Sequence, residues 1–251
     1  MHLDNLLDPD RFSLARRLSD TSIFNQNSIG CLSEKTLHKT LKYFIEPNED
    51  FHEVEYLGSV ADIKNSHGII EIQTRSFDKL KAKLDRFLTE TNVTVVYPIV
   101  QNKNILRVDF ESGEVISRRR SNKHGRLSDA LLEIAKLRDV FLHKNLSILV
   151  LILNADETRF SQAKQSVGKK STEKIDIIPT SVNGYFEVRE DRDLYSLLPA
   201  NLPLNFTSKD FAKHTGYRKI KLHIVLKFLM ERNVISRKKG KGNSFIYNVN
   251  K

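Results

Sequence analysis

The stretch that decides the expected fold is residues 58–74, which read GSVADIKNSHGIIEIQT. Two runs rich in β-branched residues flank a polar segment, and this pattern predicts two strands joined as a hairpin. Successive side chains of a strand point to opposite faces of the sheet, so Glu71 faces away from Ile70 and Ile72. We therefore expect the two isoleucines to fill the core and Glu71 to lie on the other face.

The hairpin also predicts which acidic residues meet. If the turn is Ser66-His67, Asp62 lies opposite Glu71 on the same face, and any loop of even length keeps that relation. Two carboxylates at one strand end form an oxygen-ligand site suited to Mg²⁺, which needs one or two carboxylates and otherwise keeps its waters. Such an ion lowers the pKa of a bound water and stabilises charge on a phosphate. Gln73, two residues after Glu71, is placed to orient the attacking water.

Periodicity predicts the elements around this hairpin. The expected order is αββαβ within an α/β (α+β) fold, with helices and strands at residues 33–45, 52–63, 68–74, 76–90 and 93–100. A further hairpin at 105–117, a helix at 127–137 and a buried strand at 148–153 complete a layered domain. We expect an N-terminal extension and three further segments, with bounds 1–30, 31–161, 162–190 (a connecting segment) and 191–251.

This order, with an Asp, a hairpin and then Glu-x-Gln, resembles the PD-(D/E)XK superfamily of restriction-type endonucleases and resolvases. The resemblance covers about residues 33–100. It implies that Asp62 and Glu71 hold Mg²⁺, for which Mn²⁺ can substitute, and that Gln73 occupies the position of the family's lysine. The family often has a Glu on the preceding helix, and Glu34 or the nearby His38 occupies that place here. Ala61 stands where the family has proline. A nuclease that cuts both strands usually works as a dimer, so the resemblance also implies a homodimer.

Charge is unevenly distributed along the chain. The net charge is +10, and residues 207–251 contain 12 Lys and Arg but only 2 Asp and Glu, whereas the remaining residues hold 29 of each kind. A cationic module attached to a neutral one points to a polyanionic partner. A second basic run lies at residues 118–126, and its members Arg118, Arg119, Arg120 and Lys123 are candidates for clamping DNA phosphates.

The cationic module resembles a winged helix-turn-helix. Thr207-Ser208 caps a short helix, a second helix spans about 218–232 with Ile220 in its expected buried stripe, and a hairpin with a basic tip follows. In that family the second helix enters the major groove of duplex DNA and the wing contacts backbone or minor groove. The implied DNA-binding residues are Tyr217, Arg218, Lys219 and Lys221 of the helix and Arg237, Lys238, Lys239 and Lys241 of the wing.

Several classes of protein are disfavoured. No window approaches the ~18 uninterrupted apolar residues of a membrane helix, and the mixed charges of the first ten residues do not resemble a secretory or transit peptide, so we expect a cytoplasmic protein. The single cysteine, Cys31, cannot form an internal disulfide or a thiol cluster for zinc.

Three functions follow from these patterns. The first is a Mg²⁺-dependent DNA endonuclease, in a restriction, defence, repair or transposition context. The second is a non-catalytic DNA-binding regulator that retains a nuclease-like fold. The third is an interaction adaptor that binds neither DNA nor metal. Two acids near a hairpin are also often no more than solvated strand residues.

Overall fold

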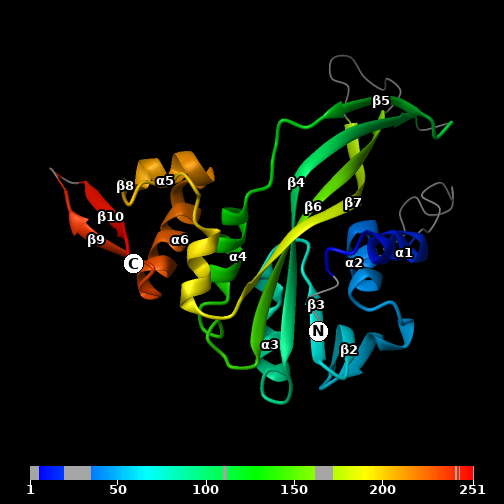
Figure 1. Cartoon of the computed structure of the whole chain (residues 1–251), viewed down its shortest axis with the longest axis horizontal. Coiled ribbons are helices and arrows are strands. Elements are labelled where there is room, and N and C mark those ends of the chain that lie inside the picture. The colour runs from blue at the N-terminus through cyan, green and yellow to red at the C-terminus, as the bar shows by residue number, and fades with distance from the viewer. Residues whose placement is uncertain are drawn as a thin grey trace.

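The computed structural model describes residues 6–19, 35–109, 112–161, 172–240, 242 and 244–250. Within these residues a seven-stranded sheet has the order β1-β2-β3-β4-β6-β7, with β5 paired to β4 (Figure 1). Its strands are β1 (His52–Tyr56), β2 (Ser59–Asn65), β3 (Gly68–Ile72), β4 (Val93–Asp109), β5 (Val115–Arg120), β6 (Leu146–Ser161) and β7 (Thr172–Val188).

The sheet is mixed. β1, β2 and β3 form an antiparallel meander, β3, β4 and β6 run parallel, and β5 and β7 pair antiparallel with β4 and β6. The parallel steps need crossover connections, which the helices after β3 and after β5 supply. The expected mixed α/β class is therefore confirmed.

Helices cover both faces of the sheet. α1 (Pro9–Ser19) and α2 (Thr36–Ile45) share one apolar cluster with Ile70 and Ile72, whereas α3 (Lys81–Phe87) and α4 (Ala130–Lys136) share another with Ile69. Neighbouring residues of β3 thus feed opposite cores, as the period of two in a strand requires. Short 3-10 helices occur at Glu49–Phe51 (η3), Phe77–Lys79 (η4), Leu127–Asp129 (η5) and Asp191–Leu197 (η6).

One predicted strand is two strands. The expected single strand 52–63 is divided into β1 and β2 by a tight turn, in which Leu57 has φ +47° and Gly58 φ +69°. Two successive left-handed residues suit the twist of a two-residue hairpin, but a leucine rarely adopts that conformation and so gave no turn signal. The order of elements is therefore αβββαβ rather than αββαβ.

The strands after α3 are longer than predicted. β4 continues past Val100 to Asp109 and stays paired with β6 throughout, across a bulge between Val100 and Asn102. Residues 172–188, assigned from the sequence to a connecting segment, form β7 along β6. The lysine-rich composition before residue 175 obscured a run of β-branched and aromatic residues behind it, and pairing with the long β6 overrides local polarity.

The C-terminal part forms a second, smaller unit. It contains β8 (Asn205–Thr207), α5 (Ser208–Thr215), α6 (Lys219–Glu231), β9 (Ile235–Lys239) and β10 (Phe245–Val249), with sheet order β8-β10-β9. The predicted cap is present: the Thr207 hydroxyl accepts from the Asp210 amide and the Asp210 carboxylate accepts from the Thr207 amide, at 3.3 and 2.8 Å. Gly216 then ends α5 with φ +77°.

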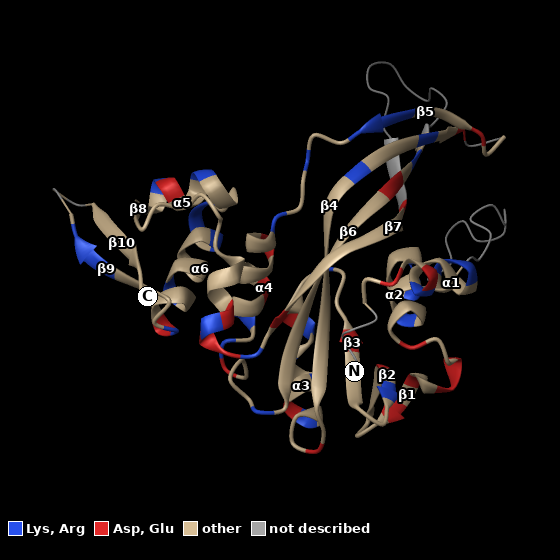
Figure 2. Ribbon diagram, viewed as in Figure 1, with Lys and Arg blue, Asp and Glu red and all other residues tan. Residues whose placement is uncertain are grey.

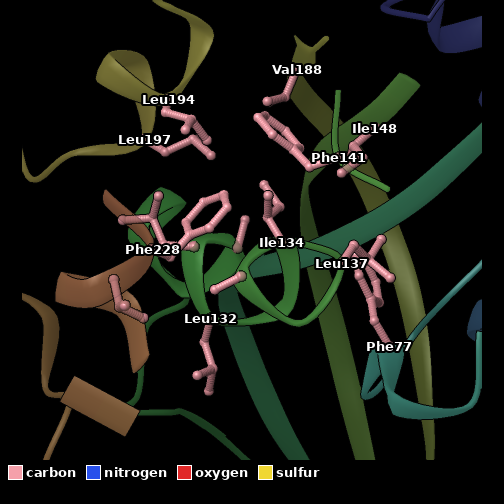
Figure 3. Close-up of a cluster of buried hydrophobic side chains, with 14 of the residues drawn as sticks. Phe77, Leu132, Ile134, Leu137, Phe141, Ile148, Val188, Leu194, Leu197 and Phe228 are labelled. Carbon is pink, nitrogen blue, oxygen red and sulfur yellow. The ribbon is translucent and has the colours of Figure 1, made fainter. Parts of the chain in front are cut away.

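The two units share one apolar core. Figure 3 shows Phe228 of α6 beside Leu132 and Ile134 of α4, and the Phe228 ring meets Phe141 edge-on with centroids 5.6 Å apart. The Tyr217 hydroxyl donates to the Ser128 carbonyl oxygen at 2.6 Å and accepts from the Leu132 amide at 3.3 Å. The C-terminal unit is therefore packed onto the α4 side of the sheet rather than tethered to it.

In the part of the chain that the structure describes, no helix is both long enough and apolar enough to cross a membrane.

Candidate functional site

The candidate site begins at the β2–β3 hairpin. Its turn is Ser66-His67, with Asn65 opposite Gly68 and Ile63 opposite Ile70, as the sequence predicts. The paired residues end at Ile63 and Ile70, and Asp62 and Glu71 are the next residues on the two strands. Gly68 makes this geometry possible because its φ is +119° and a Cβ there would lie 2.3 Å from the Asn92 carbonyl oxygen.

Asp62 is held from both sides. Its Oδ2 accepts a hydrogen bond from the backbone amide of Ile72 at 2.7 Å and lies 3.2 Å from Nε2 of His38 on α2. Burial raises the pKa of Asp62, but the hydrogen bond and charge of His38 outweigh it together with the Ile72 amide and Lys83. The net pKa lies below the ordinary value, so Asp62 is ionised at neutral pH.

Glu71 is the buried member of the pair. Its side chain is fully buried, and both of its carboxylate oxygens lie close to Nζ of Lys83, at 3.0 and 2.9 Å. Burial and the charge of Asp62 raise the pKa of Glu71 to about 7 even though Lys83 and the Asp62 backbone amide act in the opposite direction. The charge of Asp62 therefore affects Glu71, and Glu71 becomes ionised only near neutral pH.

Lys83 is a residue of this site that the sequence analysis missed. It lies on α3, which crosses over between β3 and β4, and its side chain is partly exposed. The available signal was helical spacing: position 83 follows Leu80 by three residues and precedes Phe87 by four, so a lysine falls within the apolar stripe of the helix. A cation on a buried helix face requires a partner, and Glu71 is that partner.

The other expected site residues have different outcomes. His38 contacts Asp62, as above. Gln73 directly follows β3, where its side chain is partly buried and its backbone amide donates to the Val96 carbonyl oxygen at 2.9 Å. Glu34 lies outside the described residues. Among those that are described, no group of three or more His, Cys, Asp or Glu is placed to hold a metal ion.

Sequence comparison places this region in a family. Residues 35–189, which run from α2 to just past β7, match the family described as "Domain of unknown function (DUF8091)". The chain belongs to the DUF8091 family. It is also similar to an uncharacterized protein of Treponema pallidum (strain Nichols), with 28% identity over 221 residues that cover 88% of this chain and 87% of that protein. No solved structure gives a significant match.

The DUF8091 region also carries an exposed basic strand. All six residues of β5 are exposed, and Figure 2 shows the ribbon of β5 coloured blue where Arg residues lie. Arg118 approaches Asp156 at 3.5 Å and Arg120 donates to Asn102 at 3.1 Å, while Arg119 and Lys123 are exposed. Each of the four predicted phosphate contacts in this run is thus accessible.

A polar hollow lies beside this strand on the DUF8091 sheet. Its volume is about 390 Å³, and it is lined by Asn102, Lys103, Asn104, Arg120, Asn154, Ala155 and Thr180. Side-chain hydrogen bonds run across it from Arg120 to Asn102, from Asn102 to Asn154 and on to Ser181. This hollow was not predictable from the sequence, because it depends on the extension of β4 and β6 and on β7, none of which was predicted.

The C-terminal unit follows the residues matched to DUF8091, and its predicted contacts divide into two groups. Arg218, Lys219 and Lys221 at the start of α6, and Arg237, Lys238 and Lys239 of β9, are exposed. Tyr217 is only 8% exposed and its hydroxyl is bonded to Ser128, so it is an interface residue rather than a surface contact. Lys241 lies outside the described residues.

One residue that was predicted to be buried is exposed instead. Ile220 was expected in the buried stripe of α6, but its side chain is 75% exposed. The stripe begins one turn later, with Val225, Leu226, Phe228 and Leu229 fully buried. α6 therefore opens with an exposed isoleucine among exposed cations.

Proposed function

We propose that this protein is a Mg²⁺-dependent DNA endonuclease. The observation that carries the proposal is the arrangement of Asp62, Glu71 and Lys83: two interacting carboxylates on paired strands, with an ammonium 2.9 Å from the buried one. An acidic pair that binds a divalent cation, next to a lysine, suits phosphodiester hydrolysis, because charge builds on the phosphate in the transition state.

The order of elements supports this proposal. α2, the acidic β2–β3 hairpin, the α3 crossover and the parallel strand β4 keep the succession on which the resemblance to the PD-(D/E)XK nucleases rests, with one further strand, β1, before the hairpin. Asp62 and Glu71 lie on the two strands of that hairpin. Lys83 brings to Glu71 the positive charge that Gln73 cannot supply, so the neutral residue at the family's lysine position does not argue against catalysis.

The residues present fit Mg²⁺. The donors are hard carboxylate oxygens, and Mg²⁺ is commonly held by one or two of them with water completing the shell. Burial and then the charge of Asp62 raise the pKa of Glu71, and a divalent cation near both carboxylates would favour their ionised forms. When bound, the ion would supply stabilisation of the charge that develops on the scissile phosphate.

Each side chain has a role in this proposal. His38 and the Ile72 amide keep Asp62 ionised and oriented, and the Asp62 amide and Lys83 orient Glu71. The Lys83 ammonium is partly exposed. It would donate to a phosphate oxygen or to the attacking water when the two carboxylates hold the divalent cation. Such a positioned cation contributes in the transition state, where the phosphate charge is greatest.

The C-terminal unit would deliver the DNA. Two helices followed by a hairpin agree with the winged helix-turn-helix that the sequence resembles, in which the second helix enters the major groove. The exposed cations of α6 and β9, together with Arg118, Arg119, Arg120 and Lys123, provide phosphate contacts, so we expect binding to weaken steeply with salt.

The test is cleavage of mixed plasmid and phage DNA in Mg²⁺ or Mn²⁺, with DNA binding measured separately in EDTA. Asp62→Asn, Glu71→Gln and Lys83→Met should each abolish cutting while binding in EDTA is retained. Glu55→Gln is the matched control, since Glu55 is an exposed carboxylate of the neighbouring strand β1, and it should cut normally. Binding without cutting on every substrate would favour the regulator that retains a nuclease-like fold.

A further inference from the structure

The first turn of α6 combines a highly exposed apolar side chain with several exposed cations. Ile220 is 75% exposed, the most exposed large apolar side chain among the described residues. Its sequence neighbours Lys219 and Lys221 are exposed, as is Arg218. Leaving an isoleucine in water forgoes the free energy of burial, whereas a cationic surface alone would be served by any polar residue at this position.

The chemistry of the surroundings restricts the partner. The cations favour a polyanion, and an apolar side chain among them favours a polyanion that also presents small apolar groups. Duplex DNA has this combination in its major groove, where the C5-methyl group of thymine projects between two rows of phosphates. The minor groove presents no such methyl group, so the pairing is specific to one groove and to one base.

From this exposed patch, Arg218-Lys219-Ile220-Lys221, we infer that Ile220 contacts the C5-methyl group of thymine when α6 binds duplex DNA. The inference rests on the proposed DNA-binding function and extends it to base preference. The cations on either side contact phosphates, which position the helix without reading sequence. Ile220 is then a specificity-determining residue, and it takes the place that the sequence analysis gave to Tyr217.

The backbone supports an outward direction for this turn. Lys219 has φ +48°, a left-handed conformation that a lysine seldom adopts, directly before Ile220. Tyr217, two residues earlier, is buried against Ser128 and Leu132. The chain thus leaves the interface between the units and presents the next residues to solvent.

The experiment removes the methyl group from the DNA. Binding is measured by fluorescence anisotropy in EDTA on alternating poly(dA-dT) and poly(dA-dU) duplexes of equal length, which differ only in the C5-methyl group. Thymine then occurs at every second position, so no recognition sequence needs to be known. We expect the protein to bind the thymine duplex about four-fold more tightly or better, the effect of burying one methyl group.

Ile220→Ser should bind the two duplexes equally, because the residue that distinguishes them is gone. Leu142→Ser is the matched control: Leu142 is an exposed aliphatic residue, 52% accessible, before β6, and this variant should keep the wild-type preference. Lys221→Ala should weaken binding to both duplexes by a similar factor and reduce the dependence of affinity on salt.

The outcomes separate the inference from the function on which it rests. Wild-type protein that binds both duplexes with equal affinity overturns the thymine contact and leaves DNA binding in place. A preference that Ile220→Ser retains assigns the discrimination to another residue and also overturns it. No binding to either duplex at low salt overturns the contact together with the proposed DNA interface.

Discussion

At the scale of single residues, the candidate site brings together two carboxylates that repel each other when both are ionised. Glu71 is fully buried opposite Asp62, and only Lys83 supplies a direct cationic partner to its carboxylate among the contacts described. A buried carboxylate paired with one ammonium contributes little to the stability of the folded chain, since the cost of desolvating the two charges offsets much of their attraction. Arrangements of this kind are common where a ligand or a reaction requires them.

The raised pKa of Glu71 makes stability depend on pH. Its folded pKa is about 7 against an ordinary 4.5, so the folded state holds a proton that the unfolded state has released. This contribution is fully present below pH 4.5 and is lost as the pH rises to about 7. Glu71→Gln removes the dependence, so relative to wild type its free energy of unfolding should gain about 3 kcal/mol between pH 4 and pH 8. Urea unfolding at several pH values in EDTA measures this, and a difference that does not change with pH would contradict it.

Loss of Lys83 should be felt most at alkaline pH. Lys83→Met leaves the ionised Glu71 buried without its ammonium, which we expect to cost about 3 kcal/mol at pH 8.5 and much less at pH 5, where Glu71 is protonated. The double variant Lys83→Met/Glu71→Gln should recover most of the loss at pH 8.5. Equal destabilisation at both pH values would show that Lys83 acts through packing of its methylene chain instead.

At the scale of elements, the β2–β3 hairpin depends on one glycine. Gly68→Ala places a methyl group against the Asn92 carbonyl at a φ of +119°, so the start of β3 and the residue before β4 must separate. We expect a loss of about 3 kcal/mol or more in the free energy of unfolding. Gly242→Ala is the control, because Gly242 also has a positive φ but has nothing within 4 Å of its added methyl. Its cost should be about 1 kcal/mol, and an equal effect at both positions would be contrary to this account.

The elements also show how far the sequence could lead. The β2–β3 register and the Thr207 cap were predictable because each rests on local rules, the parity of a two-residue turn and a hydroxyl three residues before an acid. The division at Leu57 was not, because a leucine gives no turn signal, and β7 was not, because pairing with the long β6 overrides the local polarity of its sequence. Ile220 was misplaced because helical spacing gives the apolar side of α6, but only tertiary packing decides which end of that side is covered. Tyr217 was misplaced because its partner, Ser128, lies far away in the sequence, whereas the helical spacing of Lys83 was a usable signal.

At the scale of the whole molecule, the two units should unfold together. Phe228 and Phe141 lie in one apolar cluster that spans α6, α4 and the sheet, and Tyr217 bonds to Ser128 across the same boundary. We expect a single cooperative transition by intrinsic tyrosine fluorescence and by circular dichroism. Tyr217→Phe removes a buried hydroxyl but leaves the Ser128 carbonyl without that donor, so it should cost about 1–2 kcal/mol.

Tyr185→Phe, at a partly buried tyrosine of β7 far from this boundary, is the comparison variant. It should change stability by less than Tyr217→Phe and leave the transition unaltered. Two separate transitions in the wild-type protein would contradict the shared core, whatever the two variants do.

The shared core has a geometric consequence. Because α6 is packed on α4 and α4 on the sheet that carries Asp62 and Glu71, a shared apolar core joins the surface proposed to read DNA to the acids proposed to cut it. A nuclease with a flexible tether would cut over a spread of positions around its recognition sequence. This protein would instead cut at a constant number of base pairs from the sequence that it contacts.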